Sequence, residues 1–163
     1  MKFQLYSFGE SGHSYKIALA LNFAKVDWQQ IFIDFFRGEA RSETYKNEIN
    51  AMAEVPVLVH GDKKISQSGA ILDYLHGKIG IYFGENEQER SEILRWVLWD
   101  NSRLSGSLGP TRFLMNFIPK DKKPIEVISY LQKRNSTALS ILESHLSMQN
   151  WIAADQFSAA DLS

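Results

Sequence analysis

A strand-like run that contains a proline, with a serine at the start of an apolar helix downstream, holds the residues best suited to binding a ligand. Proline has no N–H and keeps the preceding residue extended, so Val55 before Pro56 presents its own N–H and C=O sideways. An extended peptide ligand can pair with such a strand edge. An ordinary edge strand without a ligand also tolerates proline at this position.

Downstream, Gln67 and Ser68 stand where the pattern predicts the start of a helix. Ile71, Leu72 and Leu75 follow at the spacing of a helix with one buried face. Free N–H groups and the positive end of the helix dipole at Ser68 would attract a carboxylate. A plain N-cap is the alternative role for this serine. Together the two motifs predict a site for a peptide-like anion.

Length, charge and the absence of cysteine limit the possible classes of function. The chain has 163 residues, of which 44% are hydrophobic, enough for one ordinary domain or two small ones. A net charge of −1, with acidic and basic residues mixed along the chain, predicts no nucleic-acid partner. The lack of cysteine excludes disulfides, thiolate metal sites and a protein-borne thiol nucleophile. The histidines show no HxxxH or HExxH spacing, so no metal site is expected.

The N-terminal residues and the hydropathy pattern bear on localisation. The first five residues lead directly into a strand-like run, without the apolar core and cleavage site of a signal peptide. No apolar run approaches membrane-spanning length. We therefore expect a cytoplasmic protein with no membrane partner.

The first half of the chain alternates between strand and helix patterns. The pattern predicts a β-α-β-α-β-β-α order: strand 3–8, helix 14–25, strand 28–35, a polar helical region 37–49, strands 55–60 and 63–66 around a Gly-Asp turn, and helix 69–79. This order indicates an α/β domain over residues 1–79.

The second half shows helical patterns only. Residues 87–117 and 124–148 read as long helices after a linker at 80–84, which predicts an all-α domain over residues 85–163. Glycine and proline at 106, 109 and 110 predict a bend or break in the first of these helices. The expected inward stripe of the second consists of Ile128, Leu131, Leu139, Leu142 and Leu146.

The pattern of the last residues predicts the start of another helix. Ser158 and Asp161 fit a capping box, and Phe157 and Leu162 flank it at the spacing of a hydrophobic staple. Since the sequence stops at Ser163, we expect that the C-terminal part of the helical domain is missing from it.

Four landmarks in this order resemble the cytosolic glutathione transferases, particularly bacterial members with an active-site serine. The run from Leu5 to Ile17 resembles their first strand and catalytic loop, and Val55-Pro56 their cis-proline turn. Gln67-Ser68 resembles their γ-glutamyl-binding pair, and residues 158–161 the capping box before their core helix. The resemblance spans nearly the whole chain. It implies a thioredoxin-like domain followed by an all-helical one, glutathione as co-substrate, and a homodimer.

The resemblance also implies a mechanism. Only the thiolate of glutathione is a good nucleophile, and a free thiol with a pKa of about 8.5 is mostly protonated at neutral pH. A hydroxyl donated to the sulfur is worth roughly 1.5–3 kcal/mol and a helix N-terminus about 0.3–1, which together lower the thiol pKa by roughly 1–3 units. Ser11 matches the family's activating serine or cysteine by position. Ser14 is its rival, and Tyr6 and Ser7 are more distant candidates.

Other residues near this expected site have less defined roles. His13 could touch the co-substrate or the glycine of glutathione, although a loop histidine is commonly a solvated bystander. The glycine carboxylate needs a cation or an amide, for which the candidates are Arg37, Arg41 and Lys46.

Two parts of the sequence leave the details of the pocket open. Asn50 and Glu54 depart from the family's Asn-Pro-x-Gly-x-Val-Pro pattern, so the contacts of that loop differ from the usual form. Aromatic and methionine side chains at helical spacing are candidates for a co-substrate pocket or for a core or subunit interface: Trp96, Trp99, Phe113, Met115 and Phe117.

The resemblance therefore predicts a glutathione transferase that joins the glutathione thiolate to an electrophilic small molecule. The alternatives are a non-catalytic glutathione-binding relative and a glutathione-dependent isomerase. The missing cysteine argues against reductase chemistry through a mixed disulfide with the protein.

Overall fold

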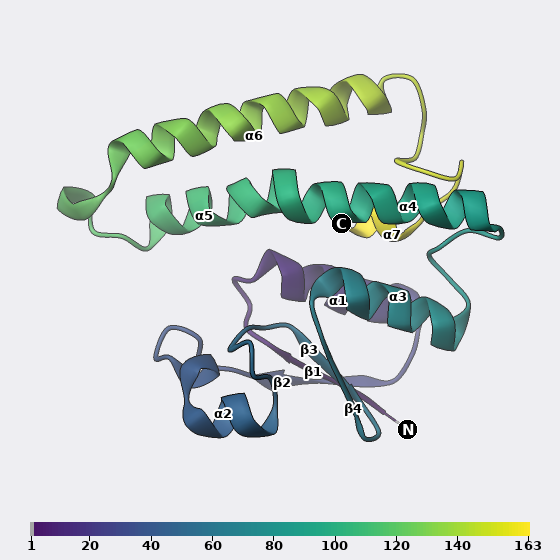
Figure 1. Ribbon diagram of the computed structural model, residues 1–163, viewed down its shortest axis with the longest axis horizontal. Helices are drawn as coiled ribbons and strands as arrows, with labels where there is room; N and C mark the ends of the chain where they lie inside the picture. The colour runs from purple at the N-terminus through teal and green to yellow at the C-terminus, as the bar shows by residue number, and fades with distance from the viewer. Residues whose placement is uncertain (1) are drawn as a thin grey trace. The chain divides into compact units, whose positions relative to one another are not determined.

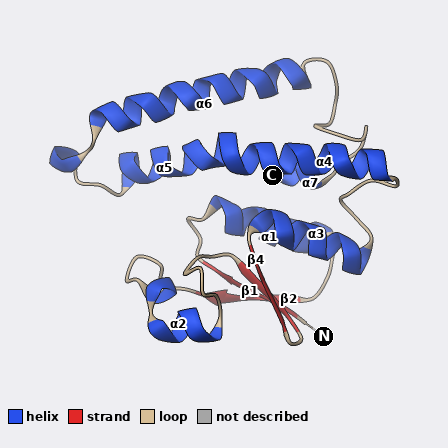
Figure 2. Ribbon diagram, viewed as in Figure 1, coloured by secondary structure: helices blue, strands red, loops and turns tan. Residues whose placement is uncertain are grey.

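The computed structural model describes residues 2–163, which divide into two compact units. One unit runs to Phe83 and the other begins at Gly84, except that Leu162 groups with the first. Within the described residues, all strands lie in the first unit, whereas the second contains only helices and loops (Figure 2). The predicted fold class, an α/β thioredoxin-like domain followed by a helical domain, is confirmed.

The first unit is built on a mixed sheet with the strand order β2-β1-β3-β4. Its strands are β1 (Phe3–Ser7), β2 (Trp28–Phe32), β3 (Val57–His60) and β4 (Lys63–Ser66). β1 pairs with β2 in parallel and with β3 in antiparallel orientation, and β3 pairs with β4 antiparallel. A parallel pair needs a crossover connection, which α1 (Gly12–Phe23) supplies between β1 and β2.

Helices cover both faces of this sheet. α1 and α3 (Ser68–Ile79) lie on one face, while η1 (Glu39–Arg41) and α2 (Glu43–Glu48) lie on the other (Figure 1). Neighbouring residues of a strand point to opposite faces. Leu5 is fully buried opposite Leu58, whereas Tyr6 packs into the cluster around Ile33 and Tyr45. The end of β1 and the starts of the helices that follow are therefore held in place by the sheet. They position the side chains of the loops between them.

Most predicted boundaries in this unit lie within two residues of the observed ones. α1 begins at Gly12 rather than residue 14, because Ser11 caps it. β2 ends at Phe32 rather than residue 35, and Ser68 is already inside α3.

The second unit consists of long helices. α4 (Glu87–Trp99), the π-helix η2 (Asp100–Leu104) and α5 (Ser105–Asn116) follow one another without a loop, and α6 (Ile125–Leu146) runs beside them (Figure 1). η3 (Lys120–Lys122) and α7 (Ala159–Leu162) are short. The capping box predicted at residues 158–161 is confirmed: Asp161 Oδ2 accepts the Ser158 N–H at 2.9 Å.

The break that the sequence offered as one possibility at residues 106–110 does not occur. The irregularity is the π-helical turn at Asp100–Leu104, and Pro110 is accommodated inside α5. Gly106 serves this turn, because a Cβ there would lie 2.8 Å from the Asn101 carbonyl oxygen. Glycine thus permits the wider turn, which was read from the sequence as a break.

The inward stripe predicted for α6 is wrong in part. Ile128 is buried, but Leu139 and Leu146 are 48% and 39% exposed. The buried face passes instead through Asn135 and Ala138. Asn135 donates a hydrogen bond to Thr111 Oγ1 of α5 at 2.9 Å, and the predicted Leu131 and Leu142 are half-buried.

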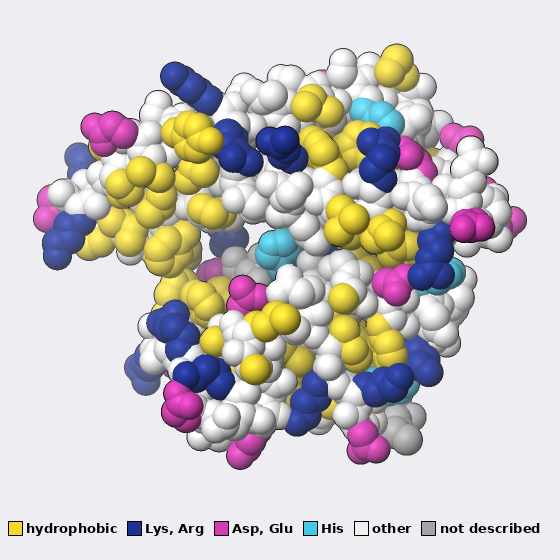
Figure 3. Space-filling model, in the orientation of Figure 1, with side chains coloured by type: hydrophobic (Ala, Val, Ile, Leu, Met, Phe, Trp, Pro, Cys, Tyr) yellow, Lys and Arg dark blue, Asp and Glu magenta, His cyan; other side chains and the backbone are white. Residues whose placement is uncertain are grey.

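Exposed hydrophobic side chains gather where α5 ends and α6 begins (Figure 3). They are Phe113, Met115, Phe117, Ile125 and Val127. Among residues 2–163, no helix combines the length and apolar composition needed to cross a bilayer.

Candidate functional site

Ser11 lies at the start of α1, in the position predicted for the thiol-activating residue. Its Oγ accepts the Ser14 N–H at 3.2 Å, so it is the N-cap of the helix. A hydroxyl has one proton and two lone pairs. Because the cap uses a lone pair, the Ser11 proton stays available to a ligand. The capping and the activating role are therefore compatible in one side chain.

The rivals of Ser11 are less accessible. The Ser14 hydroxyl oxygen is buried and has no hydrogen-bond partner among residues 2–163, so a sulfur of a bound ligand cannot reach it without a rearrangement. Ser7 is also buried, and its Oγ accepts a hydrogen bond from Gln30 Nε2 at 3.1 Å. Tyr6 packs in the cluster on the α2 side of the sheet. Of the three predicted serines, Ser11 alone combines partial exposure with a hydroxyl proton that its capping bond leaves unused.

The start of α3 differs from that of α1, because no side chain caps it. Gln67 occupies the N-cap position with φ 68° and ψ 116°, and its side chain makes no capping hydrogen bond. In the same unit, Ser11 caps α1 and Ser42 caps α2. The first-turn N–H groups of α3 are therefore not satisfied by a side-chain cap. A positive φ in a residue other than glycine costs about 1–3 kcal/mol, and such residues cluster at ligand sites.

A side-chain contact joins the two helix starts. His13, in the first turn of α1, places its Nδ1 3.1 Å from Oγ of Ser68, the first residue of α3. Ser68 is 4% exposed and His13 is half-buried. The contact brings the predicted residues of the first loop and of the γ-glutamyl-binding pair to one place. It was not foreseen from the sequence.

The peptide bond between Val55 and Pro56 is cis, as the resemblance predicted. Val55 is half-buried and Pro56 buried. Within the described part of the chain, the N–H and C=O of Val55 have no hydrogen-bond partner. They are available to an extended peptide.

Side chains of α2 and of the following turn hold the loop before Pro56. Tyr45 Oη and Asn50 Nδ2 both donate to the Glu54 carbonyl oxygen, at 2.9 and 3.0 Å. Gln67 Nε2 donates to Glu54 Oε2 at 2.7 Å, which ties the loop to the start of α3. Burial, reinforced by the nearby charge of Glu39, raises the pKa of Tyr45 to about 12. The sequence pattern marked Asn50 and Glu54 as unusual but did not reveal the role of Tyr45.

The three predicted cations differ in their partners. Arg37 Nε lies 3.6 Å from Asp34 Oδ2, and Lys46 pairs with Glu43. The Arg41 guanidinium lies 5.7 Å from the centre of the Phe35 ring and has no carboxylate partner among residues 2–163. Arg41 is thus the cation of this region best able to accept a carboxylate.

An aromatic cluster beside the Ser11 loop was missed in the sequence. The Phe8 and Phe35 rings stack at 4.5 Å, and Phe36 meets both edge-on at 5.9 Å. The Phe8 carbonyl accepts the Ser11 N–H at 3.2 Å, so the cluster adjoins the loop directly. The consecutive phenylalanines at 35 and 36 were its only signal in the sequence.

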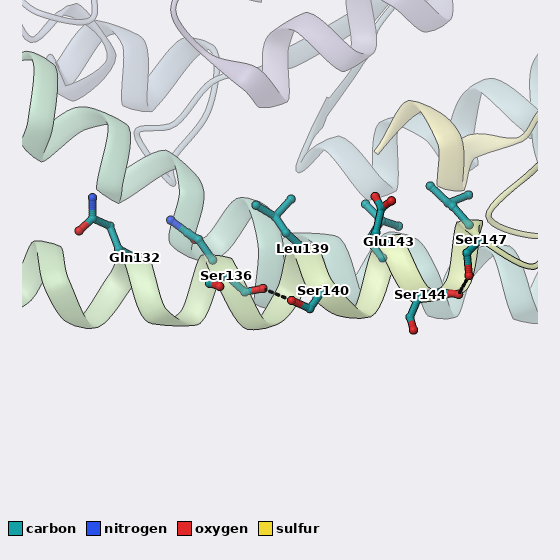
Figure 4. A pocket seen from close by; sticks show the side chains of 10 residues that line it. Gln132, Ser136, Leu139, Ser140, Glu143, Ser144 and Ser147 are labelled. Carbon is teal, nitrogen blue, oxygen red and sulfur yellow. Dashed lines mark hydrogen bonds between the residues drawn. The ribbon is translucent and has the colours of Figure 1, made fainter.

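A groove along α6 contains none of the predicted site residues. It has a volume of about 950 Å³ and is lined by polar and leucine side chains of this one helix (Figure 4). The hydroxyls of Ser140 and Ser147 donate to the carbonyls of Ser136 and Ser144, so the helix itself satisfies them. In the described residues, no three His, Asp or Glu side chains lie close enough together to hold a metal ion.

Comparisons with known proteins agree with this geometry. Residues 1–77 match the family model of the glutathione S-transferase N-terminal domain. The chain is 27% identical over 161 residues to the disulfide-bond oxidoreductase YfcG of Escherichia coli, covering 95% of this chain and 74% of that protein. It is 29% identical over 167 residues to glutathione S-transferase 1 of Dianthus caryophyllus, covering 99% and 73%.

Solved structures give the same result. A possible glutathione S-transferase from Rhodopseudomonas palustris is 27% identical with a TM-score of 0.89, over 98% of this chain and 72% of that one. A Pseudomonas putida glutathione transferase with one glutathione disulfide bound per subunit has a TM-score of 0.89 at 21% identity, over 99% and 71%. The second likeness shows the fold alone.

Proposed function

Because the chain belongs to the glutathione S-transferase family, we propose that it binds glutathione in its first unit and joins the glutathione thiolate to an electrophilic small molecule. The observation that supports this most is the joining of two helix starts by His13 and Ser68: one carries a serine with a free proton, and the other has no side-chain cap. A thiol and a carboxylate of one ligand match these two features.

The ligand would be held at three places. Its γ-glutamyl carboxylate accepts the first-turn N–H groups of α3 and the Ser68 hydroxyl. Its cysteinyl main chain pairs with the free N–H and C=O of Val55 beside Pro56. Its glycine carboxylate pairs with Arg41. Glu54, held by Gln67, offers a carboxylate to the γ-glutamyl ammonium group.

Catalysis then depends on the charge of the sulfur. Ser11 donates its hydroxyl proton in a hydrogen bond to the sulfur, which stabilises the thiolate by roughly 1.5–3 kcal/mol and lowers the thiol pKa by about 1–2 units. The thiolate attacks the electrophilic carbon, a carbon–sulfur bond forms, and the leaving group departs with its electron pair. The thiol proton has already passed to solvent. The Phe8 and Phe36 rings adjoin this position and offer an apolar surface to the electrophile.

Likeness to YfcG favours a second reaction, the reduction of a disulfide. The chain has no cysteine, so glutathione must supply the attacking sulfur. A first glutathione thiolate attacks the disulfide and expels a thiolate. A second glutathione then attacks the mixed disulfide, which yields glutathione disulfide and the second substrate thiolate.

The test compares the wild-type chain with Ser11→Ala and, as a control that keeps the hydroxyl, Ser11→Thr. We expect retention on immobilised glutathione for all three. With a chlorodinitrobenzene electrophile, turnover of Ser11→Ala should fall about 10–100-fold, while Ser11→Thr keeps most of it. Equal turnover of Ser11→Ala and wild type would remove Ser11 from the mechanism. Turnover of hydroxyethyl disulfide but not of the electrophile would favour the second reaction.

A further inference from the structure

His13 makes a side-chain contact that joins the two helix starts. Its Nδ1 lies 3.1 Å from Ser68 Oγ, although the residues are 55 positions apart in the chain. Ser68 is almost fully buried. A buried hydroxyl has few positions for its proton, so the neighbouring nitrogen decides where that proton points.

The two neutral forms of the imidazole have opposite consequences for a bound anion. If Nδ1 is bare, Ser68 donates its only proton to His13, and the lone pairs of Oγ face the ligand carboxylate. If Nδ1 carries a proton, His13 donates to Ser68, and the Ser68 proton is free for the carboxylate. Only the second arrangement gives a continuous chain of donors that ends at the anion.

We propose that His13 is a positioning residue that donates its Nδ1–H to Ser68 Oγ and so turns the Ser68 proton toward the γ-glutamyl carboxylate of glutathione. This inference rests on the proposed function. It assigns His13 to binding of the ligand's far end and places it outside the chemistry at the sulfur, where Ser11 acts. It also differs from the sequence-based expectation that His13 touches the co-substrate or the glycine.

The location of the contact supports this assignment. Ser68 is the first residue of α3, and the Gln67 side chain leaves the first-turn N–H groups uncapped. An anion at this helix start would therefore meet the N–H groups and the Ser68 hydroxyl together. His13 approaches Ser68 from α1, a different element, so it can orient the hydroxyl without occupying the uncapped end of α3.

The test separates binding from turnover with four variants of the full chain and one control variant. His13→Leu removes the donor, and His13→Asn restores an N–H near the position of Nδ1. Ser68→Ala removes the oriented hydroxyl, and a double variant combines His13→Leu with Ser68→Ala. His60→Leu is the matched control, because His60 Nδ1 makes a similar contact, 2.9 Å from Tyr74 Oη, elsewhere in the unit.

The Kd and KM for glutathione should rise about 5–20-fold in His13→Leu, while kcat at saturating glutathione stays within about 2-fold. His13→Asn should recover the KM to within about 3-fold of wild type. In the Ser68→Ala background, His13→Leu should add less than about 2-fold, because its effect acts through the missing hydroxyl. His60→Leu should leave both constants unchanged.

Nitrogen-15 NMR of the histidine rings in the glutathione-saturated protein gives an independent readout. We expect a proton on His13 Nδ1, and a bare Nδ1 in that complex would overturn the proposal. A fall in kcat at unchanged KM, or full additivity of His13→Leu with Ser68→Ala, would also overturn it. If wild type turns over and His13→Leu keeps its KM, only this inference fails. If wild type neither binds nor turns over glutathione, the proposed function fails and this inference with it.

Discussion

The helices α1 and α3 begin beside each other, but only α1 has a side chain that caps the free N–H groups of its first turn. α1 is capped by Ser11, whose Oγ accepts the Ser14 N–H, while α3 has no side-chain cap at Gln67. Each helix start leaves its first N–H groups without a partner inside the helix, and a protein side chain or a ligand can satisfy them. The first unit uses a serine at one end and leaves the other open.

This difference separates two functions of the helix starts, donation of a proton by a serine at α1 and binding of an anion at α3. At α1 the serine oxygen is used for structure and its proton remains for chemistry. At α3 the buried serine sits inside the helix, and the open end is left to an anion. Variants that change the cap of α1 or add a cap to α3 test whether this difference affects binding and turnover.

The largest effect is expected for Ser11→Asp, which keeps the cap of α1 and removes the proton donor. Asp caps helices about as well as Ser, so we expect the free energy of unfolding to stay within about 0.5 kcal/mol of wild type. Turnover should fall more than about 100-fold, because the carboxylate cannot donate and repels the thiolate. Urea unfolding and steady-state kinetics check this. Turnover that survives in Ser11→Asp would show that the hydroxyl proton is not used.

A somewhat smaller effect is expected for Gln67→Asp, which supplies the cap that α3 lacks. Its carboxylate would compete for the first-turn N–H groups and repel the ligand, so affinity for glutathione should weaken about 10–100-fold. Calorimetric titration measures this directly. Gln67→Ala is the control, since it also removes the contact with Glu54 but adds no charge. Equal losses in both variants would mean that the open helix end does not bind the anion.

Tyr45→Phe sharpens the comparison from the third side of the site, the loop before Pro56. Removal of the hydroxyl deletes one of two hydrogen bonds to the Glu54 carbonyl, and Asn50 keeps the other. We expect a loss of about 0.5–1.5 kcal/mol in the free energy of unfolding, measured with urea. Tyr15→Phe, on an exposed residue, should change it by less than about 0.5 kcal/mol. A larger loss in the control would assign the effect to tyrosine replacement in general.

The last effect concerns alkaline pH. Burial raises the pKa of Tyr45 from 10.0 to about 12 in the folded protein. The folded state therefore holds this proton more tightly than the unfolded state, so the contribution to stability is complete below pH 10.0 and declines as the pH rises toward about 12. Wild type should lose stability over this interval more steeply than Tyr45→Phe in urea unfolding at a series of pH values. Parallel curves for the two proteins would contradict the shifted pKa.

The limits of prediction are clearest in the second unit. The sequence pattern identified its long helices, but it did not predict the roles of Asn135 and Gly106. A polar residue usually indicates an exposed face, but Asn135 lies in the packed face of α6. A glycine usually indicates a helix break, but Gly106 serves a π-helical turn. Each is explained by a partner on another turn or helix, which periodicity does not report.

In the first unit, local rules were sufficient for the elements. Alternating apolar residues and the spacing behind Ser68 predicted the strands and α3, whereas the cis bond at Val55-Pro56 was predicted from the family resemblance. The strands and α3 depend on residues close together in the chain, so the sequence shows them directly.

The sequence by itself determined the order of the elements, the absence of a cysteine nucleophile and the serine before α1, because each follows from residue type or short-range spacing. Only the tertiary structure decided that His13 meets Ser68, that Tyr45 and Gln67 hold Glu54, and that the Ser14 hydroxyl is buried. These contacts join residues that come together only when the helices pack on the sheet, and the backbone geometry at that point determines which side chains are within hydrogen-bond distance.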